Sequence, residues 1–230
     1  MSDIHESTLS GQTADIAVAS RCGEEEPQKI GVVYIAYGGN AQREALESIK
    51  SLRSVWPDPY VLAVGDEVAG ATQQLAYTAT DAGGRDAKTR LWDISPFQQT
   101  LYLDADTRVR EDPRIGFDIL DDGWDMVIVP SKCHGKEWLW HVGAMERVAT
   151  QEAHSGRMLT LGGGVIWWAR NERTEALWHA WHDEWGRWGS QDQGALMRAY
   201  IANPCHIWLL SRAWNSGICI EHRFGAARRR

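Results

Sequence analysis

Two acidic residues one position apart, Asp104 and Asp106, directly follow the apolar segment from Leu101 to Leu103. Alternation along a strand sends residues i and i+2 to the same side, so beyond the strand's end both carboxylates can converge on one hard divalent cation. Such a cation could also hold a diphosphate. With 31 acidic residues in the chain, a bare Asp-x-Asp pair is more often a solvated loop. The pair gains weight here because α/β sheets bind ligands beyond the carboxyl ends of their strands.

The segment before this pair predicts a β-α-β unit that would position it. Residues 30–36 form a continuous run rich in valine and isoleucine, which is typical of a strand buried on both faces. The glycines that follow predict a turn, and a one-sided apolar stripe then predicts a helix through Ser54. Residues 60–64 supply a second buried strand, parallel to the first. Asp66 lies just past it, where it could meet a base or ribose or simply be a surface turn residue.

Further predicted elements bring other polar residues to the same edge. Residues 86–94 read as a helix that carries Lys88, whose ammonium could reach a phosphate at the edge of a pocket. Residues 126–129 predict another strand, and the segment 131–158 has no clear pattern. The strand predicted over 161–168 begins with three glycines, which indicate either a close backbone approach to something bound or a bend.

Tryptophan is abundant, with 13 residues, and four of them follow a helical period at Trp178, Trp181, Trp185 and Trp188. This stripe predicts a buried helix face. The off-stripe residues are the better candidates for stacking on a sugar ring: Trp138, Trp140, Trp167 and Trp214.

Residues 190–193, Ser-Gln-Asp-Gln, fit a capping box with Ser190 as N-cap and Gln193 reaching back from the third helical position. The capping box does not require Asp192. The carboxylate of Asp192 is favoured at a helix N-terminus and could orient a bound hydroxyl.

Composition bounds the class of protein. The chain has 230 residues, a net charge of −7 and a globular balance of 43% hydrophobic and 24% charged residues, which argues against a broad nucleic-acid surface. Its four cysteines show no metal-site spacing. No apolar run is long enough to span a membrane, and the polar start lacks the features of a signal peptide. We expect a cytoplasmic protein with a flexible arm over residues 1–28 and a basic tail over residues 226–230.

The order of these motifs resembles that of nucleotide-sugar-dependent glycosyltransferases with the GT-A fold, particularly the branch that includes glycogenin and the bacterial lipopolysaccharide galactosyltransferases. The resemblance covers residues 29–225 and rests on an ordered set of segments: the β-α-β start, Lys88, Leu-Tyr-Leu-Asp-Ala-Asp, Gly-Gly-Gly-Val-Ile-Trp-Trp, Asp-Gln, Trp214-Asn215 and Ile220-Glu221-His222. It implies a single α/β, Rossmann-like domain with a mixed, mostly parallel central sheet flanked by helices. Residues 29–107 would be its nucleotide-binding half and residues 108–225 its acceptor half.

The same resemblance implies a role for each site residue. Asp104, Asp106 and His222 would bind Mn²⁺ or Mg²⁺, with Asp104 also contacting the ribose of a donor, UDP-linked by preference. Asp192 and Gln193 would lie beside the transferred sugar at the reaction centre. The remaining donor contacts would come from Ala36, Tyr37, Gly38, Asp66, Lys88, Gly163 and Gly164.

Two departures from the family pattern stand out. An Asn-x-Gly sequence is usual where this chain has Gly162-Gly163-Gly164, and a Lys-Pro-Trp ending is replaced by Arg223-Phe224-Gly225. Arg223 could substitute for that lysine. Retention at the anomeric carbon is implied by the resemblance only. The alternative, an inverting reaction, needs a general base at the acceptor hydroxyl, and Asp183, Glu184 and Glu221 are the candidates for it.

The function predicted is transfer of a sugar to an acceptor that the sequence does not identify: a glycan, lipid, protein, small molecule or modified nucleic acid. One alternative is a non-catalytic protein that binds carbohydrate or nucleotide on the same fold. A haloacid-dehalogenase-like phosphatase fits less well, because Arg108 stands where that class has threonine or valine.

Overall fold

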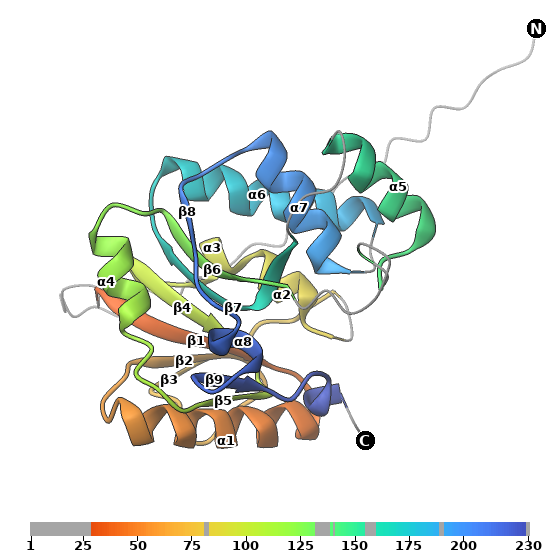
Figure 1. Ribbon diagram of the computed structural model, residues 1–230. Helices are drawn as coiled ribbons and strands as arrows, with labels where there is room; N and C mark the ends of the chain where they lie inside the picture. Colours follow the sequence, from red (N-terminus) through yellow and green to blue (C-terminus); the bar gives the residue numbers. More distant parts are fainter. Residues whose placement is uncertain are drawn as a thin grey trace, which may run out of the picture.

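The computed structural model describes residues 29–80, 83–131, 139, 141–154, 160–188 and 191–228 (Figure 1). Several predictions lie outside these residues, namely the arm over 1–28, the Ser190 side chain of the capping box, and Trp138 and Trp140 as sugar platforms. None of the described helices is long and apolar enough to cross a membrane.

A seven-stranded sheet forms the centre of the described chain, in the order β3-β2-β1-β4-β7-β6-β8. The strands are β1 (Ile30–Ala36), β2 (Val61–Gly65), β3 (Gln73–Leu75), β4 (Gln99–Leu103), β6 (Met126–Pro130), β7 (Leu161–Ala169) and β8 (Ile207–Leu209). Every neighbouring pair is parallel except the two that include β7, which runs antiparallel to both β4 and β6. The predicted mixed, mostly parallel sheet is therefore confirmed. Because β7 is reversed, its first residues lie at the same edge as the carboxyl ends of β4 and β6.

Helices cover both faces of this sheet (Figure 1). Alternate residues of β1 face opposite ways, so Val32 and Tyr34 pack with α1 while Val33 and Ile35 join the core on the other face. One face carries α1 (Gly38–Val55) and α4 (Ile115–Asp121). The other carries α2 (Arg85–Thr89), α3 (Leu91–Ile94), α6 (Glu172–Trp188) and α7 (Asp192–Ala202), with α5 (Ala144–Ala153) packed on α7.

A second, two-stranded sheet joins the middle of the chain to its C-terminal part. β5 (Thr107–Val109) pairs antiparallel with β9 (Ile220–His222), so that Thr107 lies opposite His222. The short helix α8 (Ala213–Ser216) precedes β9, and the 3-10 helix η1 (Ala226–Arg228) follows it and packs on α1. Ala226 is buried, so the boundary predicted at residue 226 does not mark the start of a separate tail.

Two local predictions differ from the structure. Gly38, predicted in a turn, is the first residue of α1, although its backbone is left-handed (φ +82°), a conformation that glycine favours. The Asp66 carboxylate accepts a hydrogen bond from its backbone N–H at 2.6 Å and so satisfies a free N–H of the first turn. The helix predicted over 86–94 is divided into α2 and α3 at Arg90, whose backbone (φ −102°, ψ 13°) leaves the helical region.

The tryptophan stripe on α6 is a core face for three of its four members. Trp178 and Trp181 are fully buried and Trp185 is 7% exposed, whereas Trp188 at the end of the helix is 38% exposed. Trp167, predicted as a sugar platform, is fully buried instead, because it lies on a central strand and donates a hydrogen bond from Nε1 to the carbonyl of Pro113 at 3.1 Å. Trp214 is half-buried and packs edge-on against Trp167.

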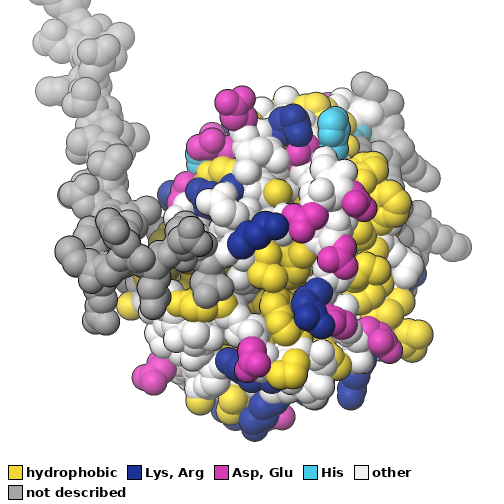
Figure 2. Space-filling model, turned by 90° about the vertical axis from the view of Figure 1, so that its left-hand side faces the viewer, with side chains coloured by type: hydrophobic (Ala, Val, Ile, Leu, Met, Phe, Trp, Pro, Cys, Tyr) yellow, Lys and Arg dark blue, Asp and Glu magenta, His cyan; other side chains and the backbone are white. Residues whose placement is uncertain are grey.

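Apolar side chains are also exposed along the edge of the main sheet. β8 is an edge strand, and its Trp208 and Leu209 are 42% and 45% exposed. Figure 2 views the molecule from the left-hand side of Figure 1 and shows hydrophobic side chains gathered among charged ones. This face lies away from the carboxyl edge at which the polar residues converge.

Replacement of Trp181 by alanine should lower the free energy of unfolding by roughly 3–5 kcal/mol. The substitution removes a fully buried indole together with the hydrogen bond from its Nε1 to the carbonyl of Asp192 at 2.8 Å. Urea denaturation of Trp181→Ala measures this loss. Trp188→Ala on the same helix is the matched control and should cost about 1 kcal/mol or less; equal losses in the two variants would contradict the burial pattern.

Candidate metal and donor site

A cavity of about 1230 Å³ opens at the carboxyl edge of the main sheet. It lies beyond β1 and β4 and against the first residues of β7, where an α/β sheet places its ligands. Ten residues that the sequence predicted as site residues line it: Tyr37, Gly38, Lys88, Asp104, Asp106, Gly163, Gly164, Asp192, Gln193 and His222.

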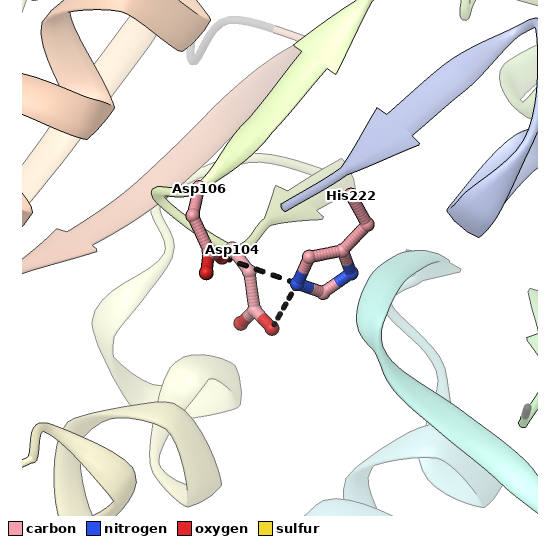
Figure 3. A group of neighbouring side chains, drawn as sticks. All are labelled: Asp104, Asp106 and His222. Atoms are coloured by element: carbon pink, nitrogen blue, oxygen red, sulfur yellow. Dashed lines mark hydrogen bonds and ion pairs between the residues drawn. The ribbon is translucent and has the colours of Figure 1, made fainter. Parts of the chain in front are cut away.

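Asp104, Asp106 and His222 form a compact group of potential metal ligands (Figure 3). The Nε2 atom of His222 lies 3.1 Å from Asp106 Oδ1 and 3.5 Å from Asp104 Oδ2. One ligand atom from each residue lies within 4.8 Å of the other two. Two carboxylate oxygens and an imidazole nitrogen are a donor set that fits Mn²⁺, and Mg²⁺ also accepts carboxylate ligands.

Backbone hydrogen bonds hold this group in place from three segments. The N–H of Asp104 donates to the carbonyl of Gly164 at 2.9 Å, which ties the end of β4 to β7. The carbonyl of Asp106 accepts from the N–H of Arg223 at 2.9 Å, and its side-chain Oδ2 accepts from the N–H of Ala226 at 3.0 Å. The C-terminal segment is thus fixed to Asp106 at two positions that follow His222.

Glycine is required at the start of β7 because polar side chains approach its backbone closely. A Cβ atom on Gly164 would lie 2.5 Å from His222 Cε1 and 2.9 Å from Asp104 Oδ2. A Cβ atom on Gly163 would lie 3.1 Å from Lys88 Nζ. At these two positions the groups that approach the backbone are the protein's own side chains, and the predicted approach to a bound molecule stays a prediction.

Lys88 connects the potential metal ligands to Asp192. Its buried ammonium lies 2.8 Å from Asp192 Oδ2 and 3.4 Å from Asp104 Oδ1. Burial alone would lower the pKa of Lys88, but Asp104 and Asp192 outweigh burial and raise it. Burial would likewise raise the pKa of Asp192, whereas Lys88 and then Arg85 hold it below its usual value. Both partners are therefore charged at neutral pH.

Tyr102 reaches the same carboxylate from β4. Its hydroxyl donates a hydrogen bond to Asp104 Oδ1 at 2.6 Å, and Lys88 Nζ lies 5.2 Å from the centre of its ring. Burial, and then the charge of Asp104, raise the pKa of Tyr102 well above its usual value, so the hydroxyl remains a donor. With Oδ1 engaged, Asp104 presents Oδ2 to His222.

Asp192 and Gln193 begin α7, but not through the predicted capping box. The N-cap is Gln191, and Gln193 donates from Nε2 to the carbonyl of Leu161 at 2.6 Å instead of reaching back to its own helix. The prediction was wrong because β7 offers a carbonyl acceptor close to α7, which local spacing does not show. The bond fixes the Gln193 amide against the start of β7.

Two predicted donor contacts, Ala36 and Asp66, do not line the cavity. Ala36 is fully buried in the core shared with α1, and Asp66 is occupied by the N–H of Gly38. Arg223 forms an ion pair with Glu44 at 3.2 Å and also lies outside the lining, so the structure does not support its use in place of the family's lysine.

Three further lining residues were not assigned a role from the sequence. Arg85 Nε lies 4.0 Å from Asp192 Oδ1, Asn215 accepts a hydrogen bond from His222, and Phe224 stacks on the His222 ring. For Arg85, the preceding pair Gly83-Gly84 was the sequence feature that could have indicated a site. Gly84 has a φ of +72°, and a Cβ there would lie 2.8 Å from Tyr37. Asn215 belongs to the Trp214-Asn215 segment of the family resemblance, which implied no role for it, and Phe224 belongs to no motif that indicates chemistry.

Three solved glycosyltransferase structures are similar to this chain. Mouse xyloside xylosyltransferase 1 in its apo form has a TM-score of 0.54 and 11% identity, over 81% of this chain and 86% of its own. The glycosyltransferase GlyE of Streptococcus pneumoniae TIGR4 has a TM-score of 0.53 and 14% identity, over 82% of this chain but only 46% of GlyE, so this chain spans about half its length. The galactosyltransferase LgtC, in complex with donor and acceptor sugar analogues, has a TM-score of 0.50 and 13% identity, over 86% of this chain and 81% of its own.

No protein-family model and no curated protein matches the sequence. At these low identities the structural similarity establishes the fold. The chain has the GT-A fold, as the order of its motifs predicted.

The stability that Asp106 contributes to the metal-free protein should depend on pH. Burial would raise the pKa of its carboxyl, but the hydrogen bond and the charge of His222 in its doubly protonated form, and then backbone N–H groups, lower it from 3.8 to about 2. Because the folded pKa is the lower one, the contribution, about 2 kcal/mol, is fully present above pH 3.8 and is lost as the pH falls through about 2. Urea denaturation of wild type and Asp106→Asn should show a gap near pH 6 that narrows below pH 4.

The control for this prediction is Asp58→Asn, which changes an exposed aspartate outside the cavity. Its unfolding free energy should follow that of the wild type at every pH. A gap for Asp106→Asn that stays constant between pH 6 and pH 2.5 would contradict the inferred hydrogen bonding of the carboxylate.

Proposed function

We propose that this protein is a metal-dependent glycosyltransferase that moves a sugar from a nucleotide-diphosphate donor, UDP-linked by preference, to an acceptor. The observation that carries the proposal is the group of Asp104, Asp106 and His222 at the carboxyl edge of a GT-A sheet, directly beside the Lys88–Asp192 ion pair. This arrangement supports a site that holds a cation at one end and a polar sugar at the other.

Asp104, Asp106 and His222 would hold Mn²⁺ or Mg²⁺. When bound there, the ion would neutralise negative charge on the departing diphosphate, so that less uncompensated charge develops on the leaving group as the anomeric bond breaks. Lys88 is within reach of the same place, because its ammonium already contacts Asp104. It would donate a hydrogen bond to the donor as the leaving group gains negative charge.

The donor would be oriented by residues on both sides of the cavity. Tyr37 and Gly38 line it at the end of β1 and would lie beside the nucleobase. The backbone of Gly163 and Gly164 lets the donor approach β7 without a side chain in between. Asp192 would accept hydrogen bonds from sugar hydroxyls, and Gln193, held by the carbonyl of Leu161, would line the face on which the acceptor attacks.

Transfer with retention at the anomeric carbon is the outcome we propose. The sequence offered Asp183, Glu184 and Glu221 as general bases for an inverting reaction, and none of them lines the cavity. Glu221 pairs with Arg110, and Glu184 pairs with Arg187 and Arg198. The acidic groups among the described lining residues are Asp104, Asp106 and Asp192, all of which have other roles in this proposal.

Binding of UDP should require both a divalent metal and Asp106. Isothermal titration calorimetry of UDP with and without Mn²⁺ tests this on the wild type and on Asp106→Ala, with GDP as the competing nucleotide. Loss of one ligand should abolish measurable metal-dependent UDP binding, because two remaining protein ligands hold the ion weakly. Circular dichroism should show that Asp106→Ala is folded.

The matched control is Asp58→Ala, which removes an exposed carboxylate outside the cavity lining and should bind UDP like the wild type. UDP affinity that is unchanged in Asp106→Ala would disprove the metal assignment. A wild type that binds neither nucleotide under any condition would overturn the proposed function.

Asp192 should matter for sugar transfer more than for nucleotide binding. Asp192→Asn keeps the size of the side chain but removes the charge that pairs with Lys88, so it should reduce turnover of the UDP-sugar by roughly 100-fold while UDP affinity changes by less than about threefold. Turnover is measured as the rate at which UDP is released when the sugar of a UDP-sugar is hydrolysed or transferred. An equal loss of UDP affinity would place Asp192 at the nucleotide instead of the sugar.

A further inference from the structure

We infer that Asn215 is a positioning residue that fixes the tautomer of His222, so that the unprotonated Nε2 atom faces Asp104 and Asp106. The inference rests on the proposed metal site and extends it to a residue that the sequence left without a role. Its basis is the hydrogen bond between His222 Nδ1 and Asn215 Oδ1, at 2.8 Å.

The chemistry of the amide oxygen decides which ring nitrogen carries the proton. Asn215 Oδ1 can only accept a hydrogen bond, so Nδ1 of His222 must be the donor. In a neutral imidazole the lone pair then belongs to Nε2. Figure 3 shows Nε2 directed at the two aspartates and the other ring nitrogen on the opposite side of the ring.

Asn215 is well placed to impose this tautomer. Its side chain is buried, with 7% exposure, on α8, which packs against both β7 and β9. The absence of a side chain at Gly162 leaves room for its amide, since a Cβ there would lie 3.0 Å from Asn215 Nδ2. The hydrogen bond is therefore formed in a packed environment and not on the surface.

The plane of the His222 ring is held as well. The ring of Phe224 stacks on it with centroids 4.0 Å apart and an angle of 16° between the planes. Close to Cε1, Gly164 leaves space that any larger residue would fill. Together with Asn215, these contacts leave the imidazole one orientation, with Nε2 toward the carboxylates.

The consequence is a site that attracts a cation before one is bound. In the neutral ring with Nδ1 protonated, Nε2 is an acceptor that lies 3.5 Å from Asp104 Oδ2 and 3.1 Å from Asp106 Oδ1. Its contact with Asp106 is a hydrogen bond only when the ring is doubly protonated, so that the Nε2–H group donates. The opposite tautomer would place an N–H group among these oxygens and would have to give it up before a metal could bind. A hydrogen bond from the second ring nitrogen is also the usual means by which proteins orient a metal-binding histidine.

Two substitutions test whether the hydrogen-bond acceptor at position 215 is needed or only a side chain of this size. Asn215→Leu removes the acceptor at similar size, whereas Asn215→Asp keeps an oxygen that accepts from Nδ1. Nitrogen-15 NMR of the metal-free proteins at pH 8 reports which ring nitrogens of each histidine carry a proton. His222→Gln identifies the signal of His222 among the eight histidines.

We expect wild type and Asn215→Asp to show an unprotonated Nε2 at His222, and Asn215→Leu to show a mixture of tautomers. Calorimetry with Mn²⁺ alone should give an affinity roughly 10-fold or more weaker for Asn215→Leu than for wild type, with Asn215→Asp at or above wild type. Near-ultraviolet circular dichroism checks that each variant is folded.

The outcomes distinguish this inference from the proposed function. If wild type binds Mn²⁺ and Asn215→Leu has the same tautomer and the same affinity, the inference is overturned while the metal site stands. A protonated Nε2 in the wild type would also overturn it. If wild type fails to bind Mn²⁺ although its tautomer is as inferred, the proposed metal site fails and the role of Asn215 is confined to orienting the ring.

Discussion

The candidate site depends on the close approach of the β7 backbone to the end of β4. Because β7 is the reversed strand, its glycines enter the sheet where β4 ends, and the carbonyl of Gly164 accepts the N–H of Asp104 at 2.9 Å. His222 then packs against Gly164 at a distance that a side chain there would prevent, and Lys88 packs against Gly163, where a Cβ would lie 3.1 Å from Nζ and would require a small shift of Lys88. The positions of the carboxylates, the imidazole and the ammonium all follow from this one contact between two strands.

Much of the fold could be predicted from local pattern. The bounds of β1 and the existence of α1, β2, β4, β6 and β7 follow from apolar runs and helical periods in the sequence. Exceptions arose where a distant group satisfied the backbone, as when Asp66 accepts the N–H of Gly38 and allows α1 to begin at a glycine. The capping box failed for the same reason, since Gln193 found the carbonyl of Leu161 on another element.

The site could be predicted only in part, because its members come from segments far apart in the chain. Asp104 and Asp106 follow a strand and are visible as a pair, whereas His222 joins them through the pairing of β5 with β9, across more than a hundred residues. Resemblance to a family suggested this long-range contact, and no spacing in the sequence could have done so. Asn215 and Phe224 contact His222 through an amide and a stacked ring. Asn215 was visible only as part of the Trp214-Asn215 segment, and neither residue's contact with His222 could be predicted from its spacing in the sequence.

Charge explains why these residues belong together. Three carboxylates, Asp104, Asp106 and Asp192, line one cavity, and like charges this close oppose one another's ionisation. Lys88 lies between Asp104 and Asp192 and offsets their repulsion, while Asp106 is stabilised by the N–H of Ala226 and by His222 when the imidazole ring is doubly protonated. If His222 is neutral, no full positive charge lies between Asp104 and Asp106, and a divalent cation would supply it. With the cation in place, the negative end of the cavity would become one that attracts a diphosphate, while the Lys88–Asp192 pair would remain to hold the sugar.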